Sequence, residues 1–162
     1  MAQDLNNMPL LSDNTEYPEI YVVCKASYQD GDIYGVWIDT TQPMQDILKQ
    51  IALMQYEGYH GDDEMLSKGY CPDPDTYFIH SHIGFYDVDI YGNAKIEDIR
   101  AYGLFIAQYG ELGAELISIN NGNLEKAKRF MDECYLGEYE SRAAYATKLF
   151  NQHYLPRIPK DL

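Results

Sequence analysis

The first half of the chain carries the short apolar runs and turn signals of an antiparallel sheet. Residues 19–28 are rich in β-forming side chains and predict a strand, and the Asp30-Gly31 pair that follows is a strong signal for a hairpin turn. Residues 33–38 predict the return strand, and residues 76–82 predict a third strand. The alternatives for residues 84–91 are a strand or a loop.

One helix is expected between the second and third strands. It begins near residues 41–43, and apolar side chains at helical spacing form its inner face: Ile47, Leu48, Ile51 and Met54. Residues 56–75 contain Gly, Pro and acidic residues and predict a long loop.

After residue 92 the apolar spacing becomes helical. Asn93 is expected to cap a helix that Gly110 ends, with residues 112–119 forming a second, short helix. The inner face expected for the first of these helices consists of Ile96, Ile99, Gly103 and Ile106.

Two more helices are expected towards the C-terminus. Asn123 caps one of them, and Ser141 caps the other, which continues to about His153. The apolar stripe expected on the helix after Asn123 consists of Leu124, Ala127, Phe130, Met131 and Cys134.

These elements predict an α+β fold: a small antiparallel β-sheet domain with one helix, followed by a small helical region. We expect a flexible leader over residues 1–18, the sheet domain over residues 19–91 and a small helical domain over residues 92–122. Residues 123–162 are then the helical start of a third, incomplete domain.

Charge changes this picture more than any motif does. The chain has 12 Lys and Arg against 26 Asp and Glu, a net charge of −14, and residues 1–124 hold 20 of the acidic residues and only 5 basic ones. The acids are dispersed, which indicates a folded acidic surface and not an acidic tail. Such a surface repels nucleic acid and anionic lipid, so the favoured partner is a basic protein surface.

Cysteine usage and the N-terminal residues indicate a cytoplasmic protein. Cys24, Cys71 and Cys134 are odd in number and far apart, as expected of reduced thiols. The first residues lack the basic and apolar regions of a signal peptide, and no apolar run approaches the roughly 20 residues of a membrane span.

The sequence gives little support for a catalytic or metal-binding site. His80 and His82 would share one face of a regular strand and could bind one metal ion with His60 or Cys71, although packing or hydrogen bonding at a strand end is the commoner role of such residues. The Asp62-Asp63-Glu64 run lacks the spacing of a calcium loop and fits a solvated acidic loop. No nucleophile elbow, zinc-protease or phosphate-loop motif occurs, so an enzyme is unsupported.

Dispersed acid without a catalytic site suggests another function. Duplex DNA presents one negative charge per roughly 1.7 Å of its axis, and a folded surface of Asp and Glu can imitate that pattern. The alternatives from composition alone are a generic acidic protein-interaction module or the metal-dependent enzyme built around His80 and His82.

Four blocks resemble the ArdA family of antirestriction proteins, in the family's order. They are residues 18–39 (PEIYVVCKASYQDGDIYGVWID), 75–85 (DTYFIHSHIGF), 110–114 (GELGA) and 133–146 (ECYLGEYESRAAYA). The last block is similar to the family's GEY-S-YA pattern through Tyr135, Gly137, Glu138, Tyr139, Ser141 and Tyr145.

The resemblance implies an antirestriction protein without enzymatic activity or a cofactor, carried on mobile elements. It implies a homodimeric DNA mimic that occupies the DNA-binding groove of the methyltransferase and specificity subunits of type I restriction-modification enzymes. The negative charge separately leads us to expect no nucleic-acid and no membrane partner. We expect the mimic surface to consist of Asp30, Asp32, Asp39, Asp46, Glu57, Asp62, Asp63, Glu64, Asp73, Asp75, Asp87, Asp89, Glu97, Asp98, Glu111 and Glu115.

The chain departs from the family pattern at two places. Ser81, His82 and Ile83 stand where the family has an acidic Asp-Tyr-Glu segment, which removes two acids from the mimic surface. The family pattern also continues past the position of Leu162, so we expect a C-terminally short form.

Overall fold

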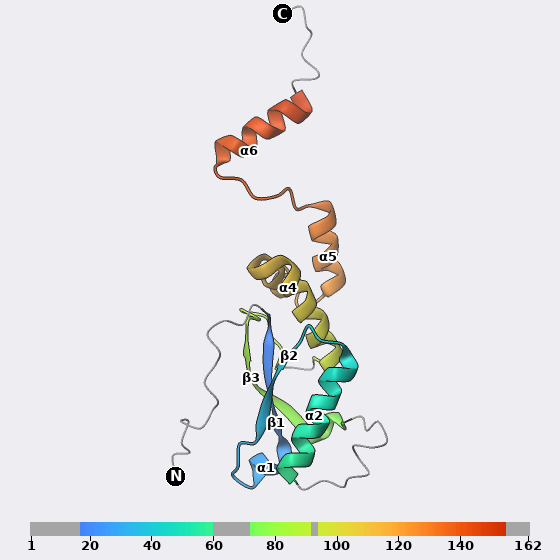
Figure 1. Ribbon diagram of the computed structural model, residues 1–162. Helices are drawn as coiled ribbons and strands as arrows, with labels where there is room; N and C mark the ends of the chain where they lie inside the picture. The colour runs from blue at the N-terminus through green and yellow to red at the C-terminus, as the bar shows by residue number, and fades with distance from the viewer. Residues whose placement is uncertain (1–16, 60–71, 92–93, 155–162) are drawn as a thin grey trace, which may run out of the picture. The chain divides into compact units, whose positions relative to one another are not determined.

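The computed structural model describes residues 17–59, 72–91 and 94–154. The chain divides into two units, Met1–Lys128 and Arg129–Leu162. The first unit contains a three-stranded antiparallel sheet in the order β2-β1-β3 (Figure 1). Together with the helices described below, this sheet confirms the α+β class.

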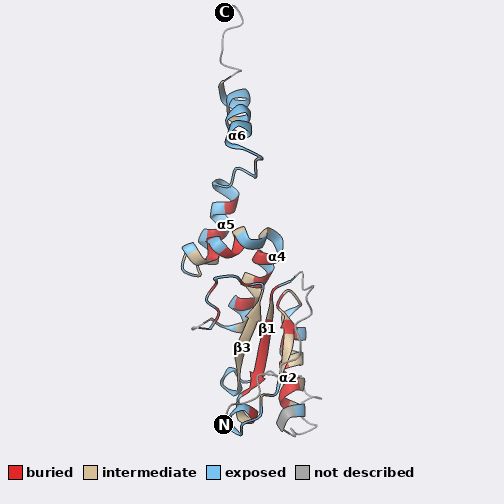
Figure 2. Cartoon of the chain, turned by 90° about the vertical axis from the view of Figure 1, so that its left-hand side faces the viewer, coloured by how far each residue is buried: buried red, intermediate tan, exposed pale blue. Residues whose placement is uncertain are grey.

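Strand β1 (Glu19–Cys24) lies between β2 (Gly35–Asp39) and β3 (Tyr77–Ile83). Its apolar side chains are almost completely removed from solvent, and Figure 2 shows β1 as a buried band beside the half-buried β3. The three expected strands are therefore present, and the first of them is the centre of the core.

The first connection differs from the expected hairpin. The strand expected over residues 19–28 ends at Cys24, and Lys25–Gln29 forms the short helix α1. The chain turns because the Asp32 N–H donates to the Ser27 carbonyl at 2.9 Å, while Gly31 adopts a φ of 92°. The glycine supplies a positive φ, but a helical turn replaces the two-residue hairpin loop that the Asp30-Gly31 pair predicted.

Helix α2 (Met44–Tyr59) packs on β1 and β2 through its expected apolar face. Ile47, Ile51 and Met54 are buried, and Leu48 is half-buried. The helix continues past residue 56, where a loop was expected to begin, and residues 60–71 of that loop lie outside the described residues. The 3₁₀ turn η2 (Pro74–Thr76) then leads into β3.

Residues 84–91 form an irregular loop, which decides between the two alternatives for this stretch. Phe85, Val88 and Ile90 anchor this loop in the core.

Helix α4 (Ile96–Ile119) is interrupted at Gly110, which has φ 63° and ψ −146°. The predicted break between two helices is therefore confirmed, because this backbone conformation suits glycine. The expected cap, Asn93, lies outside the described residues, and the Lys95 N–H donates to the Asp98 carboxylate at 3.2 Å at this end. Ile99, Gly103 and Ile106 are buried as expected, and Ile96 is half-buried.

Close contacts fix the first half of α4 against the residues that follow β2. A Cβ on Gly103 would overlap the Thr40 side chain, whose Oγ1 donates to the Pro18 carbonyl at 2.7 Å. The Arg100 Nε–H donates to the Gln42 carbonyl at 2.6 Å. The helix is thereby held against the chain that connects β2 to α2.

Helix α5 (Leu124–Glu133) follows a turn in which Asn121 and Gly122 have positive φ. The Asn123 Oδ1 accepts from the Lys126 N–H at 3.0 Å, as the predicted cap requires. The apolar stripe is narrower than predicted, because only Ala127 and Met131 of its five members are buried, Leu124 is half-buried, and Phe130 and Cys134 are exposed.

The second unit contains α6 (Arg142–Leu149) and the wider turn η3 (Phe150–Tyr154). Ser141 caps α6 as predicted, since its Oγ accepts from the Ala144 N–H at 3.1 Å. No residue of α6 is buried, and Figure 2 shows it in the colour of exposed residues.

Candidate functional site

The acids expected to form a mimic surface come from many elements of the first unit. All of those in the described residues are exposed except Asp39, which is half-buried. Asp62, Asp63 and Glu64 lie outside the described residues. The exposed members follow α1, lie on α2 and α4, and occupy the connections on either side of β3: Asp30, Asp32, Asp46, Glu57, Asp73, Asp75, Asp87, Asp89, Glu97, Asp98, Glu111 and Glu115.

These acids are not neutralised by neighbouring cations within the described residues. The ion pairs found there are on α5, where Glu125 lies 3.6 Å from Lys128 and Glu133 lies 3.7 Å from Arg129. Among the described residues, the acids expected on the mimic surface therefore have no Lys or Arg partner within ion-pair distance.

Several of the acids also hold the local backbone. Asp39 accepts from the N–H and the hydroxyl of Thr41, both at 2.7 Å. Asp73 accepts from the Asp75 N–H at 2.9 Å, and Asp89 accepts from the Tyr91 N–H at 3.0 Å. These short-range bonds leave further lone pairs on each carboxylate, so it remains able to accept from another molecule.

Glu57 is held over a longer separation in sequence. The Tyr34 hydroxyl donates to the Glu57 carboxylate at 2.9 Å. This hydrogen bond is the main reason why the pKa of Tyr34 is raised. This contact joins the chain before β2 to the C-terminal part of α2.

Glu19 is a further acid of the sheet that was not included in the expected mimic surface. It lies directly opposite Asp39 in the β1–β2 ladder. Burial raises the pKa of Glu19, and the charge of Asp39 raises it further. Only the register of the two strands, which the sequence does not specify, reveals this pair of like charges.

Three of the acids surround a hollow of about 470 Å³, which we call the acidic pocket. Asp87, Asp89 and Asp98 line it together with Tyr102, Ser118 and the Asn121-Gly122 turn. The Tyr102 hydroxyl donates to the Gly122 carbonyl at 2.8 Å. Burial raises the pKa of Tyr102, and the nearby Asp98 charge adds to the effect.

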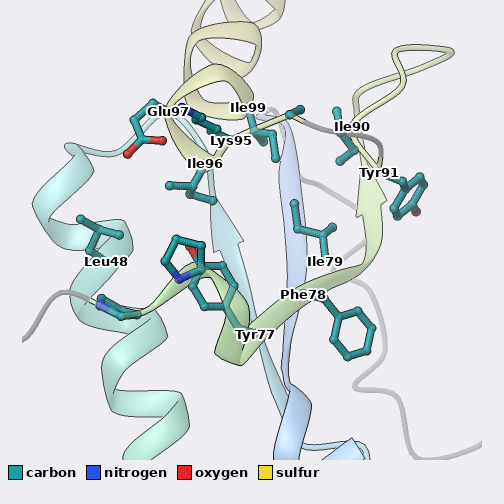
Figure 3. Close-up of a pocket in the computed structure, with 13 residues that line it drawn as sticks. Leu48, Tyr77, Phe78, Ile79, Ile90, Tyr91, Lys95, Ile96, Glu97 and Ile99 are labelled. Atoms are coloured by element: carbon teal, nitrogen blue, oxygen red, sulfur yellow. The ribbon is translucent and has the colours of Figure 1, made fainter.

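A second hollow, of about 780 Å³, lies between α2, β3 and the start of α4. Figure 3 shows the Tyr77 side chain pointing towards Leu48, whereas the Phe78 side chain points away from both. Ile96 and Ile99 line the hollow from α4. Its lining is mostly apolar, and its charged members are Lys95 and Glu97. This composition offers no pair of convergent groups for acid–base chemistry.

The two histidines do not form the shared site that a regular strand would give. A bulge between Tyr21 and Val22 in the β1–β3 ladder interrupts the alternation on which that hypothesis depended. His80 packs with the rings of Tyr21, Tyr28 and Phe78, and its Nδ1 lies 2.7 Å from the Ser81 Oγ.

His82 has different neighbours, the rings of Phe85 and Tyr91. Its burial lowers the pKa of its imidazole. His60 and Cys71 lie outside the described residues, and within the described ranges no three His, Cys, Asp or Glu side chains are grouped to hold a metal ion.

The motif residues of the C-terminal block build local structure. Gly137 has a φ of 98°, and the Tyr139 hydroxyl donates to the Leu136 carbonyl at 2.7 Å. The ring centroids of Tyr139 and Tyr145 lie 5.0 Å apart. In the sequence these two residues flank Ser141, which caps α6. The remaining two motif residues, Tyr135 and Glu138, are exposed.

In the part of the chain that the structure describes, no helix has the length and apolarity needed to cross a membrane. Residues 20–162 match the model of a family described as Antirestriction protein (ArdA). No curated protein and no solved structure matches the chain.

Proposed function

Because this chain belongs to the ArdA family of antirestriction proteins, we propose that it inhibits type I restriction-modification enzymes by imitating DNA. In this proposal its acidic surface occupies the DNA-binding groove of the methyltransferase and specificity subunits. The inhibitor acts by occupancy, without catalysis or a cofactor. Its active form is a cytoplasmic homodimer.

The observation that carries the proposal is the exposed acid of the first unit, which lacks neighbouring cations within the described residues. A groove that binds DNA presents Lys and Arg to phosphates. Carboxylates on several elements of one folded unit can meet such a groove, and binding then releases counterions as DNA binding does. Like charge also excludes DNA itself as the partner.

The test is competition for a purified type I methyltransferase. Increasing amounts of the full chain are added to the enzyme bound to a labelled duplex that contains its recognition sequence. We expect the duplex to be displaced competitively, and the affinity of the chain for the enzyme to fall steeply between about 50 and 200 mM salt. Undiminished DNA binding at a large excess of the chain would contradict the proposal, as would an affinity that salt does not change.

Matched variants separate the mimic surface from net charge. One variant carries Asp46→Asn, Glu97→Gln and Glu111→Gln, which lie exposed on α2 and α4. The control carries Glu125→Gln, Asp132→Asn and Glu133→Gln on α5, with the same change in charge. The first variant should compete more weakly than the control, and equal losses would show that only total charge matters.

A further inference from the structure

The turn between α4 and α5 contains an Asn-Gly pair, and Asn121 is the only asparagine in the sequence that a glycine follows. Such an asparagine is prone to deamidation, because glycine has no Cβ to shield its backbone nitrogen. The Gly122 nitrogen attacks the Asn121 Cγ atom, the Cγ–Nδ2 bond breaks, and ammonia leaves with the displaced proton. Water then opens the resulting succinimide ring to aspartate or isoaspartate, so the reaction needs no enzyme, oxidant or cofactor.

The fold holds the attacking nitrogen. The Gly122 N–H donates to the Ile117 carbonyl at 2.9 Å, and the Asn121 N–H donates to the Ser118 carbonyl at 3.0 Å. These two bonds close the end of α4, and they accompany positive φ angles of 53° at Asn121 and 79° at Gly122. A nitrogen whose proton is bound to a carbonyl cannot attack, so the reaction requires this turn to open.

A residue distant in sequence closes the turn from the other side. The Tyr102 hydroxyl donates to the Gly122 carbonyl at 2.8 Å. The same hydroxyl lies 2.8 Å from the position that a Cβ on Gly122 would occupy, so this contact requires glycine. Tyr102 is half-buried, whereas Asn121 is exposed to water. The reactive side chain is therefore accessible, and the bonds of the next residue's backbone are what restrain it.

We propose that Asn121 is a spontaneous deamidation site that the Tyr102–Gly122 hydrogen bond keeps latent in the folded protein. The product adds one negative charge to a chain of net charge −14, beside a hollow that Asp87 and Asp98 also line. Isoaspartate also inserts a methylene into the backbone, which the hydrogen bonds of the closed turn do not accommodate. A modified turn therefore stays open. This inference goes beyond the proposed function, since it involves no restriction enzyme.

The test follows deamidation of the full chain at neutral and mildly alkaline pH, with the product at Asn121 measured by peptide mapping and mass spectrometry. Tyr102→Phe removes the hydroxyl that closes the turn. The matched control, Tyr109→Phe, removes a hydroxyl of the same helix whose partner is the exposed Gln108 side chain. We expect Tyr102→Phe to react about two- to tenfold faster than wild type, the factor by which one hydrogen bond favours the closed turn. Tyr109→Phe should react at the wild-type rate, and wild type unfolded in urea should react fastest.

Hydrogen exchange of wild type gives a second measurement that needs no variant. The Gly122 amide proton exchanges through the same opening that frees its nitrogen to attack. Its protection should therefore match the factor by which folding slows deamidation at Asn121. Thermal unfolding shows whether Tyr102→Phe keeps its fold, and if it does not, the comparison of exchange with deamidation in wild type decides.

The inference is overturned if wild type deamidates at Asn121 as fast when folded as when unfolded, or if folded Tyr102→Phe reacts no faster than Tyr109→Phe. A Gly122 amide that exchanges freely while deamidation stays slow would overturn it as well. So would product at Asn121 that forms only in the unfolded chain and in neither folded wild type nor folded Tyr102→Phe.

Discussion

The ring of Tyr21 lies across the backbone of Gly35 on the neighbouring strand. Its Cζ atom is 2.9 Å from the position that a Cβ on Gly35 would occupy, and the Val23 side chain is equally close. Tyr21 also packs against Trp37, with ring centroids 5.2 Å apart. The glycine thus creates the space in which this aromatic pair covers one face of the sheet.

Gly35→Ala should therefore destabilise the protein. The new methyl group would meet the Val22 carbonyl oxygen as well as the two side chains, and the carbonyl belongs to the central strand and cannot move aside. Overpacking of this kind costs about 1–3 kcal/mol. Urea unfolding measures the loss, and Gly31→Ala, where nothing lies near the added methyl group but φ is positive, separates crowding from backbone strain. Unchanged stability in Gly35→Ala would contradict the packing described for Tyr21.

Glu19→Gln should stabilise the protein at pH 7. Glu19 and Asp39 are like charges directly opposite each other, and the pKa of Glu19 is raised, so the folded state holds its proton more tightly than the unfolded state does. The cost therefore appears as pH rises from about 4.3, the ordinary value for Glu, through the folded pKa. We expect a gain of about 0.2–1 kcal/mol at pH 7 that disappears below pH ~4.

Urea unfolding of wild type and variant at both pH values measures this difference. Asp39→Ala serves as the contrast, because it also removes the charge pair but loses the two bonds to Thr41. A Glu19→Gln variant that is destabilised equally at both pH values would show that the repulsion is not the dominant effect.

His82 should make the stability depend on pH in a different range. Burial lowers the pKa of this imidazole in the folded state, so its neutral form is favoured there. The unfolded state then binds more protons below pH ~6.5, and stability is lost as pH falls through the folded pKa. Thermal unfolding between pH 7.5 and about 5 should show a steeper loss in wild type than in His82→Gln. An identical slope in the two proteins would contradict this, and exposed His153→Gln serves as the control.

Ser141→Ala should loosen α6. This side chain accepts the Ala144 N–H, and α6 has no buried residue to compensate for the loss. Removing a serine cap typically costs about 0.5–2 kcal/mol of helix stability. Hydrogen exchange at the amides of Ala144 and Tyr145 should accelerate, while Ser141→Asn, which restores an acceptor, should behave almost as wild type. Equal acceleration in both variants would exclude capping as the role of this residue.

Signals that act over a few residues were sufficient to predict much of the fold. The break at Gly110, the caps at Asn123 and Ser141 and the inner face of α2 all depend on neighbouring residues, and the structure has them. The strand predicted through residue 28 was too long, because Lys25–Gln29 forms the helix α1. The β-propensity of these residues does not specify where a strand ends.

Features that depend on distant contacts could not be predicted. The β-bulge that separates the surroundings of His80 and His82 is a property of strand register. The acidic pocket requires the turn at Asn121 to lie beside a loop near residue 87, although nothing in either segment indicates the other. The sequence therefore indicated which residues are acidic, and folding determined which of them face one another.

The position of β1 in the sheet has a consequence for biosynthesis. The central strand is made before both of its neighbours, and the β3 residues follow only after α2 has been made. A chain growing at about 5–20 residues per second therefore leaves the apolar strand Ile20–Cys24 without its second neighbour for several seconds. During that interval the nascent chain depends on the β1–β2 pair and on α2 to shield the segment that later forms the core.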